Sequence, residues 1–311
     1  MALLTPVPYD TKIDFIRQRF ISMGVSLFIS IASIVGLFTI GLNYGVDFKG
    51  GYLLEVRSEK PFDLSLLRGK LDALGFGEVK LQEAGSPNDV MIRIEKKEDE
   101  NSTQNVTIQK VKEALGEDVQ YRRIETVGPK VSEALKRNGI LAVVCALLAM
   151  LVYIWFRYEW QFGISGIIAL IHDCITVIGF YVFTGFEFNE SAVVAILMTA
   201  GYSINDTVVI YDRIRENMRK FKKTSLIDLI NRSVNDTLSR TVLTSSTTLI
   251  ALFSLYFFGG KVIEDLALPM IVGIGTGTYS SIFVSSVLLL YFKPPRGEDF
   301  TPEVEVVAPA R

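Results

Sequence analysis

The chain has 311 residues, a formal net charge of −2 and a hydrophobic content of 49%. A charge so close to zero gives no electrostatic reason to expect nucleic acid as a partner. The only histidine is His172, and Cys145 and Cys174 lie in apolar runs without metal-ligand spacing, so we expect no metal site, no structural disulfide and no cofactor. Several windows reach the roughly 20 apolar residues that cross a bilayer, which favours an integral membrane protein.

The first 19 residues are short and basic, with Lys12, Arg17 and Arg19 just before an apolar run. That run covers residues 20–42, is long, and has no small-x-small cleavage site before polar sequence, so it predicts an uncleaved spanning helix rather than a signal peptide. Its basic flank is expected in the cytoplasm.

Residues 43–137 are polar, carry charges of both signs and are long enough for a small soluble domain. Val90, Ile92 and Ile94 alternate with a period of two, which is typical of a strand, whereas other segments have helical spacing. In order, the pattern predicts a strand at 51–58, a helix at 63–74, strands at 78–84 and 89–95, a helix at 107–115 and a strand at 119–127. This order indicates an α+β ferredoxin-like domain.

Five more apolar runs predict spans at residues 138–156, 162–184, 188–211, 242–258 and 269–292. Six spans place both termini on one side of the membrane. Residues 212–241 form a basic loop and the turn before the fourth span is acidic, so the positive-inside rule puts that loop and both termini, including the tail 293–311, in the cytoplasm. The predicted fold is a six-helix membrane bundle with an extracytoplasmic domain between its first two helices.

The stretch Gly201–Asn217 carries Asp206 into an apolar run. An ionised carboxylate in hydrocarbon costs several kcal/mol unless it is paired, hydrated or protonated, so the helix face that holds it should look into protein or water. Thr199, Tyr202 and Ser203 share that face by helical spacing, and Asn205 precedes the acid. We expect Asp206 to be functional; the alternative is an acid that only hydrogen-bonds a neighbouring helix.

Two further polar groups accompany the spans. His172 and Asp173 lie near the middle of the third span, where they could pass protons or could equally form a static hydrogen-bonded knot. Arg240 opens the fifth span, and Thr244 follows on its face. The topology places Arg240 in the same half of the membrane as Asp206, so the two can pair, although Arg240 could also be an ordinary basic flank that binds lipid headgroups.

No Walker A loop, Ser-His-Asp order or HExxH motif occurs, so we predict a protein that is not an enzyme and draws its energy from an ion gradient or a partner. One charge moved through 100 mV is worth about 2.3 kcal/mol. Gly273 and Gly277 give the last span a small-residue face that favours close helix packing.

Five segments in order resemble the SecF family of protein translocase subunits. They are GVDFKGG (with Asp47, Gly50 and Gly51), VGPKVSEAL (with Gly128 and Pro129), IHD at 171–173, GYSINDTVVIYDRIREN at 201–217 and NRSVNDTLSRT at 231–241. The resemblance covers essentially the whole chain except the tail, and no motif position departs from the family pattern.

The resemblance implies half of a resistance-nodulation-division (RND) type transporter in the bacterial inner membrane. It implies SecD as a separate partner chain, the SecYEG channel, YajC-type and YidC-type accessory proteins, and preproteins whose late export is driven by the proton gradient. It assigns proton coupling to Asp206 and Arg240, with Asp173 and His172 as further candidates. Proton and sodium coupling both stay open, as do a scaffold subunit without ion coupling and an RND-type half that transports small solutes.

Overall fold

The computed structural model describes residues 11–76, 79–83, 86–95, 104–116 and 119–295. Six of its helices are long and apolar enough to cross a membrane, which confirms the expected class of fold. The chain divides into two compact units. Among the described residues, the helical unit comprises those within 11–42, 143–186 and 194–295, and the sheet unit comprises those within 43–142 and 187–193.

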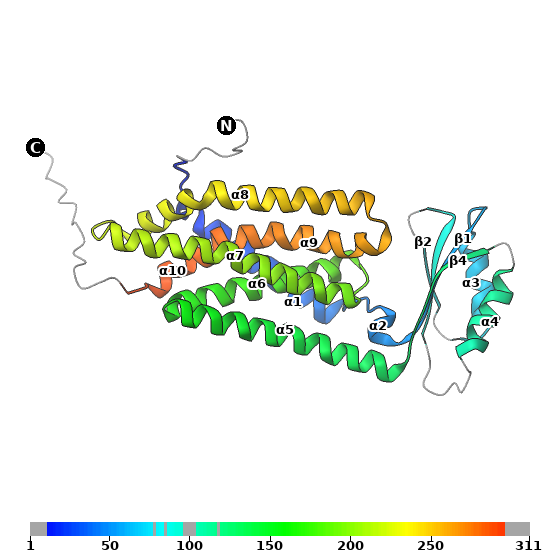
Figure 1. Cartoon of the computed structure of the whole chain (residues 1–311). Coiled ribbons are helices and arrows are strands. Elements are labelled where there is room, and N and C mark those ends of the chain that lie inside the picture. Colours follow the sequence, from blue (N-terminus) through cyan, green and yellow to red (C-terminus); the bar gives the residue numbers. More distant parts are fainter. Residues whose placement is uncertain (1–10, 77–78, 84–85, 96–103, 117–118, 296–311) are drawn as a thin grey trace, which may run out of the picture. The chain divides into compact units, whose positions relative to one another are not determined.

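The helices that could span a membrane are shown in Figure 1. They are α1 (Arg19–Thr39), α5 (Pro129–Arg157), α6 (Trp160–Thr184), α7 (Glu190–Lys220), α8 (Leu226–Phe258), and α9 (Lys261–Ser280) continued by a π-helical turn (Ser281–Ser285) and α10 (Ser286–Phe292). A short 3-10 turn, Ile16–Gln18, precedes α1.

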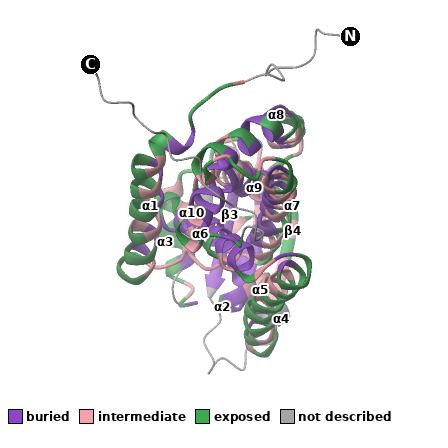
Figure 2. Ribbon diagram, turned by 90° about the vertical axis from the view of Figure 1, so that its left-hand side faces the viewer, coloured by how far each residue is buried: buried purple, intermediate pink, exposed green. Residues whose placement is uncertain are grey.

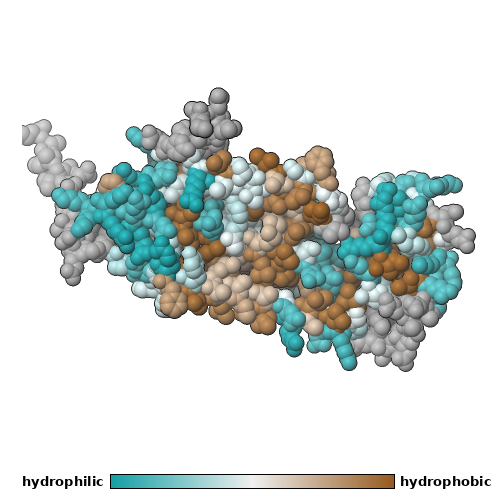
Figure 3. Space-filling view, in the orientation of Figure 1, coloured by the Kyte–Doolittle hydropathy of each residue, from teal (hydrophilic) through white to brown (hydrophobic). Residues whose placement is uncertain are grey.

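Burial differs widely among these helices. The most apolar window of α6 is 61% buried, whereas that of α5 is only 6% buried. Figure 2 shows exposed residues (green) along the outward faces of α1 and α5. In Figure 3 apolar residues (brown) cover the middle of the visible face of the bundle, and hydrophilic residues (teal) gather at the end where α7 and α8 connect. An apolar middle facing lipid and a hydrophilic end in contact with water are expected of a bundle that spans a membrane.

The segment expected as a basic loop, residues 212–241, is mainly helical: α7 continues to Lys220, and α8 begins at Leu226. Its apolar residues recur at helical spacing and pack into one core, so charged groups occupy only the outer side. The buried members of this stripe are Ile214, Leu229, Ile230, Val234 and Leu238. The last span also starts earlier than expected, because α9 begins at Lys261 and contains Pro269 in its interior.

The sheet unit has the predicted order of elements. Its members are α2 (Val46–Lys49), β1 (Gly51–Ser58), α3 (Leu64–Asp72), β2 (Val79–Glu83), β3 (Asp89–Glu95), α4 (Gln104–Leu115) and β4 (Val119–Val127). The four strands pair antiparallel in the order β2-β3-β1-β4, the ferredoxin-like order. Alternate residues of β1 and β3 are buried in one apolar core together with residues of α3 and α4, as their period of two predicts.

Candidate functional site

The polar face of α7 is buried inside the helical unit. Thr199 and Ser203 are each 1% exposed and Asp206 is 2% exposed. Tyr202 is half-buried, whereas Asn205 is exposed. The spacing of the three buried residues places them on one side of the helix, so the inward face expected from the sequence is the face that packs against protein.

Helix α9 lies directly against this face because it has glycine at the contact points. A Cβ atom at Gly273 would lie 2.1 Å from Oγ1 of Thr199, and one at Gly277 would lie 3.0 Å from Cβ of Ser203. One turn further, Oγ1 of Thr207 and Oγ of Ser281 are hydrogen-bonded at 3.0 Å. The small-residue face predicted on the last span is therefore a contact with the polar face of α7.

Asp173 is the centre of the hydrogen bonding between these helices. Its side chain is completely buried, and its Oδ2 accepts hydrogen bonds from Ser203 (2.5 Å) and Ser280 (2.8 Å). Its Oδ1 lies 3.0 Å from Nδ1 of His172. One carboxyl group thus joins α6, α7 and α9. Nε2 of His172 has no hydrogen-bond partner within the described part of the chain.

Asp206, three residues after Ser203 on α7, is less completely hydrogen-bonded than Asp173. It lies close to Ser245 of α8, and Arg240 is near enough for electrostatic attraction. Within the described residues, however, its Oδ2 is buried without a hydrogen-bond partner, and no ion pair with Arg240 forms there. Asp206 therefore has an incompletely satisfied carboxyl group with a cation close by.

Hydroxyl groups of three helices are hydrogen-bonded beside Asp206. Tyr202 donates a hydrogen bond to Oγ of Ser245 (3.4 Å), which in turn is bonded to Oγ1 of Thr278 (2.7 Å). This short chain of hydroxyl groups connects α7, α8 and α9 beside the acid. Arg240 itself is exposed. Thr244 does not join the chain, because its hydroxyl donates to backbone oxygens of its own helix.

Sequence reasoning missed Ser245 and Ser280 as partners of these acids. The signal for Ser280 was a stretch rich in Gly, Ser and Thr, residues 273–286, but helical spacing alone does not select it. The π-helical turn Ser281–Ser285 begins directly after Ser280, and both Ser280 and Ser281 are fully buried. Such turns widen the helix locally and occur often at functional sites.

The two motifs that flank the ferredoxin-like domain meet in the sheet unit. Gly50 and Gly51 have φ values of +76° and +138°, which favour glycine. A Cβ atom at Gly50 would lie 3.4 Å from the carbonyl oxygen of Val127 and 3.6 Å from Cα of Pro129. Gly128 precedes Pro129, the first residue of α5. Gly50 therefore allows the start of β1 to pass close to the end of β4 and the start of α5.

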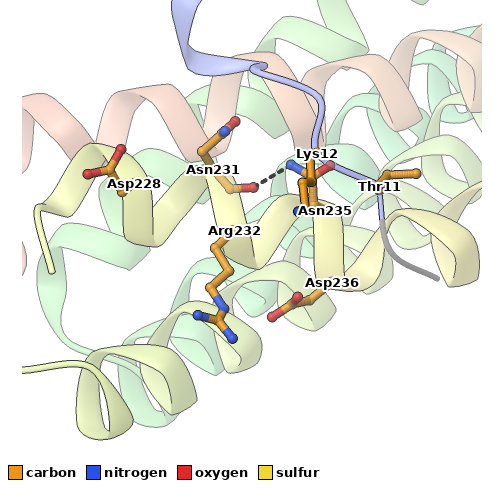
Figure 4. Close-up of a pocket in the computed structure, with 7 residues that line it drawn as sticks. All are labelled: Thr11, Lys12, Asp228, Asn231, Arg232, Asn235 and Asp236. Carbon is orange, nitrogen blue, oxygen red and sulfur yellow. Dashed lines mark hydrogen bonds between the residues drawn. The ribbon is translucent and has the colours of Figure 1, made fainter.

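The fifth motif, residues 231–241, holds the segment that precedes α1. The backbone N–H of Ile13 donates to Oδ1 of Asn235 (3.0 Å), and Nδ2 of Asn235 donates to the oxygen of Ile13 (2.8 Å). Asn231 accepts from the N–H of Phe15 at 2.9 Å. A cavity of about 450 Å³ lies beside these contacts. It is lined by side chains of both charge signs from the N-terminal segment and α8 (Figure 4), namely Lys12, Arg232, Asp228 and Asp236.

The fold defines an integral membrane protein of the helical-bundle class. Its described residues include six apolar helices, a carboxyl group shared by three of these helices, and a ferredoxin-like domain between the first two. Residues 107–294 match the family described as protein export membrane protein SecD/SecF, C-terminal, and residues 35–62 match the SecD/SecF GG motif. The chain belongs to the SecD/SecF family of protein export membrane proteins.

Individual relatives agree with this assignment. The chain is 42% identical over 288 residues to protein translocase subunit SecF of Rickettsia akari, covering 92% of this chain and 94% of the relative. It is 46% identical over 289 residues to protein translocase subunit SecF of Magnetococcus marinus, covering 91% and 93%.

Solved structures agree as well. The crystal structure of SecDF from Thermus thermophilus, described as a translocon-associated membrane protein, matches with a TM-score of 0.83 and 36% identity over 92% of this chain. SecDF in the super-membrane-facing form matches with a TM-score of 0.66 and 34% identity over 91% of this chain. In both comparisons the chain spans 39% of the SecDF chain.

Proposed function

We propose that this chain is the SecF-type subunit of an export motor in the bacterial inner membrane. In this proposal it works with a separate SecD chain, assists preprotein transport through the SecYEG channel, and uses the proton motive force to drive late steps of translocation. Both termini are cytoplasmic, and YajC-type and YidC-type proteins are further partners. Support for SecD comes from the match to SecDF, a longer chain of which this protein spans 39%.

The observation that carries the proposal is the state of Asp206. Its carboxyl group is buried between helices, has one oxygen without a hydrogen-bond partner among the described residues, and has Arg240 close by but not in contact. Such a group has two competing ways to be stabilised, by taking up a proton or by approaching the cation. Alternation between them would couple proton passage to movement of α7 against α8.

Asp173 and His172 take a supporting part in this proposal. Ser203 lies on α7 less than one turn from Asp206 and donates to Asp173. A change in the charge of Asp173 would alter this hydrogen bond, because a charged acceptor binds a donor more strongly than a neutral one. The pair therefore offers a second point at which a proton could change the contact between α6 and α7.

The test is export by an Asp206→Asn variant. The amide is similar in size but cannot cycle a proton, so we expect the part of preprotein export that depends on the proton gradient to fall about tenfold or more, since one charge moved through about 100 mV is worth about 2.3 kcal/mol. The measurement is preprotein translocation into inverted membrane vesicles with and without the gradient.

The matched control is Asn205→Ala, which changes an exposed neighbour on the same helix and should leave export unchanged. An Asp206→Asn chain that assembles with SecD and exports at the wild-type rate would contradict the coupling.

A scaffold subunit without ion coupling is the second candidate, and the tight contact of Gly273 with Thr199 favours it. This candidate expects Asp206→Asn to be harmless, while enlargement of Gly273 prevents assembly. Co-purification of both variants with SecD, measured beside export, separates the two functions.

A further inference from the structure

The second half of the loop between α6 and α7 belongs to the sheet unit rather than to the helical unit. Residues 187–193, which include the first turn of α7, group with residues 43–142. Within the sheet unit they contact the segment 43–51, which carries the GVDFKGG motif. Asp47 of this motif contacts the first residue of α7.

Backbone and ring contacts fix this loop on the motif. The N–H of Gly45 donates to the oxygen of Phe188 (2.9 Å), and the N–H of Phe188 donates to the oxygen of Asn43 (2.8 Å). Tyr44 and Phe188 thereby form a parallel β-bridge. The ring of Phe48 lies 5.7 Å from that of Phe188, centre to centre. Phe188 of the loop thus contacts both the start of the motif and the two residues that precede it.

Residues on either side of Phe188 in the chain make two further contacts, each with a charged side chain. Oδ2 of Asp47 accepts a hydrogen bond from the N–H of Glu190 (3.1 Å), the first residue of α7. A carboxylate there satisfies a free N–H of the helix end and interacts favourably with its dipole. Arg93 of β3 forms an ion pair with Glu187, and their side chains are only 9% and 14% exposed. Removing one partner of a pair so little exposed costs more free energy than breaking a surface pair, because it leaves a buried charge without its partner.

We infer that Asp47, Arg93 and Glu187 form an α7 clamp, a set of positioning residues that fixes the start of α7 to the ferredoxin-like sheet. Helix α7 is continuous from Glu190 to Lys220 and contains Asp206. At about 1.5 Å per residue, Asp206 lies some 24 Å along the helix from the clamp. A shift or rotation of α7 caused by a change at Asp206 is therefore passed to β3 and to the motif. This inference rests on the proposed function.

The test is a charge exchange across the buried pair. Arg93→Glu and Glu187→Arg each place like charges together and open the clamp, whereas the double variant restores an opposite pair. We expect each single variant to lower gradient-dependent export about tenfold, within the range usual for coupling energies, and the double variant to recover most of it. All variants are measured as full chains with SecD.

The control uses a second ion pair on the same sheet. Arg123 and Glu125 of β4 pair with side chains 36% and 35% exposed, so Arg123→Glu should leave export unchanged. Hydrogen exchange supplies a readout independent of export. Asp206→Asn should change the protection of β3 amides in the wild-type background, and this change should vanish in either single variant and return in the double.

The outcomes separate the clamp from the motor. If Asp206→Asn blocks export but both single charge variants export normally, the inference of an α7 clamp is wrong, whereas the proposed proton-driven function is supported. If Asp206→Asn exports normally, the motor is wrong, and the response of β3 to Asp206→Asn still decides the clamp. Should the charge variants fail to accumulate, Asp47→Ala takes their place, because it removes one contact from the first turn of α7. Unchanged export and an intact β3 response in Asp47→Ala would overturn the clamp.

Discussion

The two buried carboxyl groups of the helical unit differ in how well they are satisfied. Asp173 has hydrogen-bond partners at both oxygens, supplied by His172, Ser203 and Ser280. Asp206 has one oxygen without a partner among the described residues. A fully bonded acid stabilises one arrangement, whereas a partly bonded acid is ready to exchange partners. This difference is why we propose Asp206 as the group that exchanges partners. Asp173 has a holding role, in which a change of its charge would strengthen or weaken its hydrogen bond with Ser203.

Replacement of Asp173 by alanine tests the holding role. The change takes the hydrogen-bond partner from His172 and Ser203, whereas Ser280 still donates to the carbonyl oxygen of Gly277. Each buried group left unpaired costs about 1–3 kcal/mol. We expect a clear fall in the thermal unfolding midpoint of the full chain in detergent, and a smaller fall for Asp173→Asn, which keeps an acceptor oxygen.

The comparison variant is Glu216→Ala, which breaks exposed ion pairs on the same bundle and should leave the midpoint unchanged. Equal midpoints for Asp173→Ala and wild type would show that this carboxyl group does not hold the helices together.

The identity of both acids was predictable from the sequence, because a charge in an apolar run is conspicuous. Their partners were not. Ser280 is 107 positions from Asp173 in the chain, and nothing in the spacing of Ser280 shows that a π-helical turn follows it. Likewise, Arg240 and Asp206 were expected in the same half of the membrane. The distance between their side chains depends on how α7 and α8 pack, which the sequence does not show.

At the scale of helices, the contact between α7 and α9 depends on the absence of side chains. Gly273 and Gly277 face Thr199 and Ser203, so the two backbones approach closely and bring hydroxyl groups within reach of Asp173. The sequence indicated this packing face, yet it could not indicate which helix would occupy it, since small residues favour close approach to any neighbour.

Enlargement of Gly273 tests this contact. The Cβ atom of Gly273→Ala would overlap Thr199, and overpacking of this kind costs about 1–3 kcal/mol, so the thermal unfolding midpoint in detergent should fall. Gly275→Ala on the same helix is the matched control, because nothing lies within 4 Å of the added atom.

A second change should relieve the overlap. Thr199→Ala removes Oγ1 and Cγ2, which the new methyl group meets at 2.1 and 2.8 Å, and keeps Cβ at 2.9 Å. The double variant should therefore recover part of the stability lost in Gly273→Ala. If Thr199→Ala gives no recovery, the destabilisation has another source than this contact.

The lengths of α7 and α8 exceed what hydropathy indicated. Apolar windows detect the part of a helix that sits in lipid and stop at the first cluster of charges. Beyond that point both helices continue because Ile214 and Ile230 are buried in the core, while Arg213, Glu216 and Lys220 pair at helical spacing on the outside. A pattern of period 3.6 in residues 212–241 would have indicated this extension.

At the scale of the whole molecule, the order of elements was largely predictable and the grouping of segments was not. Alternation along β1 and β3 and helical spacing in α3 and α4 were sufficient for the ferredoxin-like order. By contrast, residues 187–193 follow α6 in the chain yet belong to the sheet unit. Their assignment depends on long-range contacts such as the ion pair between Arg93 and Glu187, which no local pattern encodes.

Because the two units have separate cores, they should respond differently to acid. Asp89 begins β3 opposite Arg57 of β1, and its two oxygens accept from Nε (2.7 Å) and Nη2 (2.6 Å) of that guanidinium group. Its side chain is only 5% exposed. The Arg57 guanidinium, helped by Ser86 and Arg122, holds the pKa of Asp89 below its usual value despite burial. The pair therefore stabilises the folded sheet unit only while the carboxyl group is ionised.

The sign of the pH dependence follows from this lowered pKa. An unfolded Asp titrates near a pKa of about 3.9, so the stabilisation is fully present above that value and is lost as the pH falls through the lower folded pKa. Asp89→Asn should weaken the sheet unit near neutral pH, and its difference from wild type should begin to shrink below about pH 4 and disappear only once the pH has fallen below the lowered folded pKa. The measurement is hydrogen exchange of β1 and β3 amides in the full chain, corrected for intrinsic exchange rates, with α6 amides as the internal reference. A difference that persists undiminished in acid, or that spreads equally to α6, would mean that the ion pair is not what holds β1 against β3.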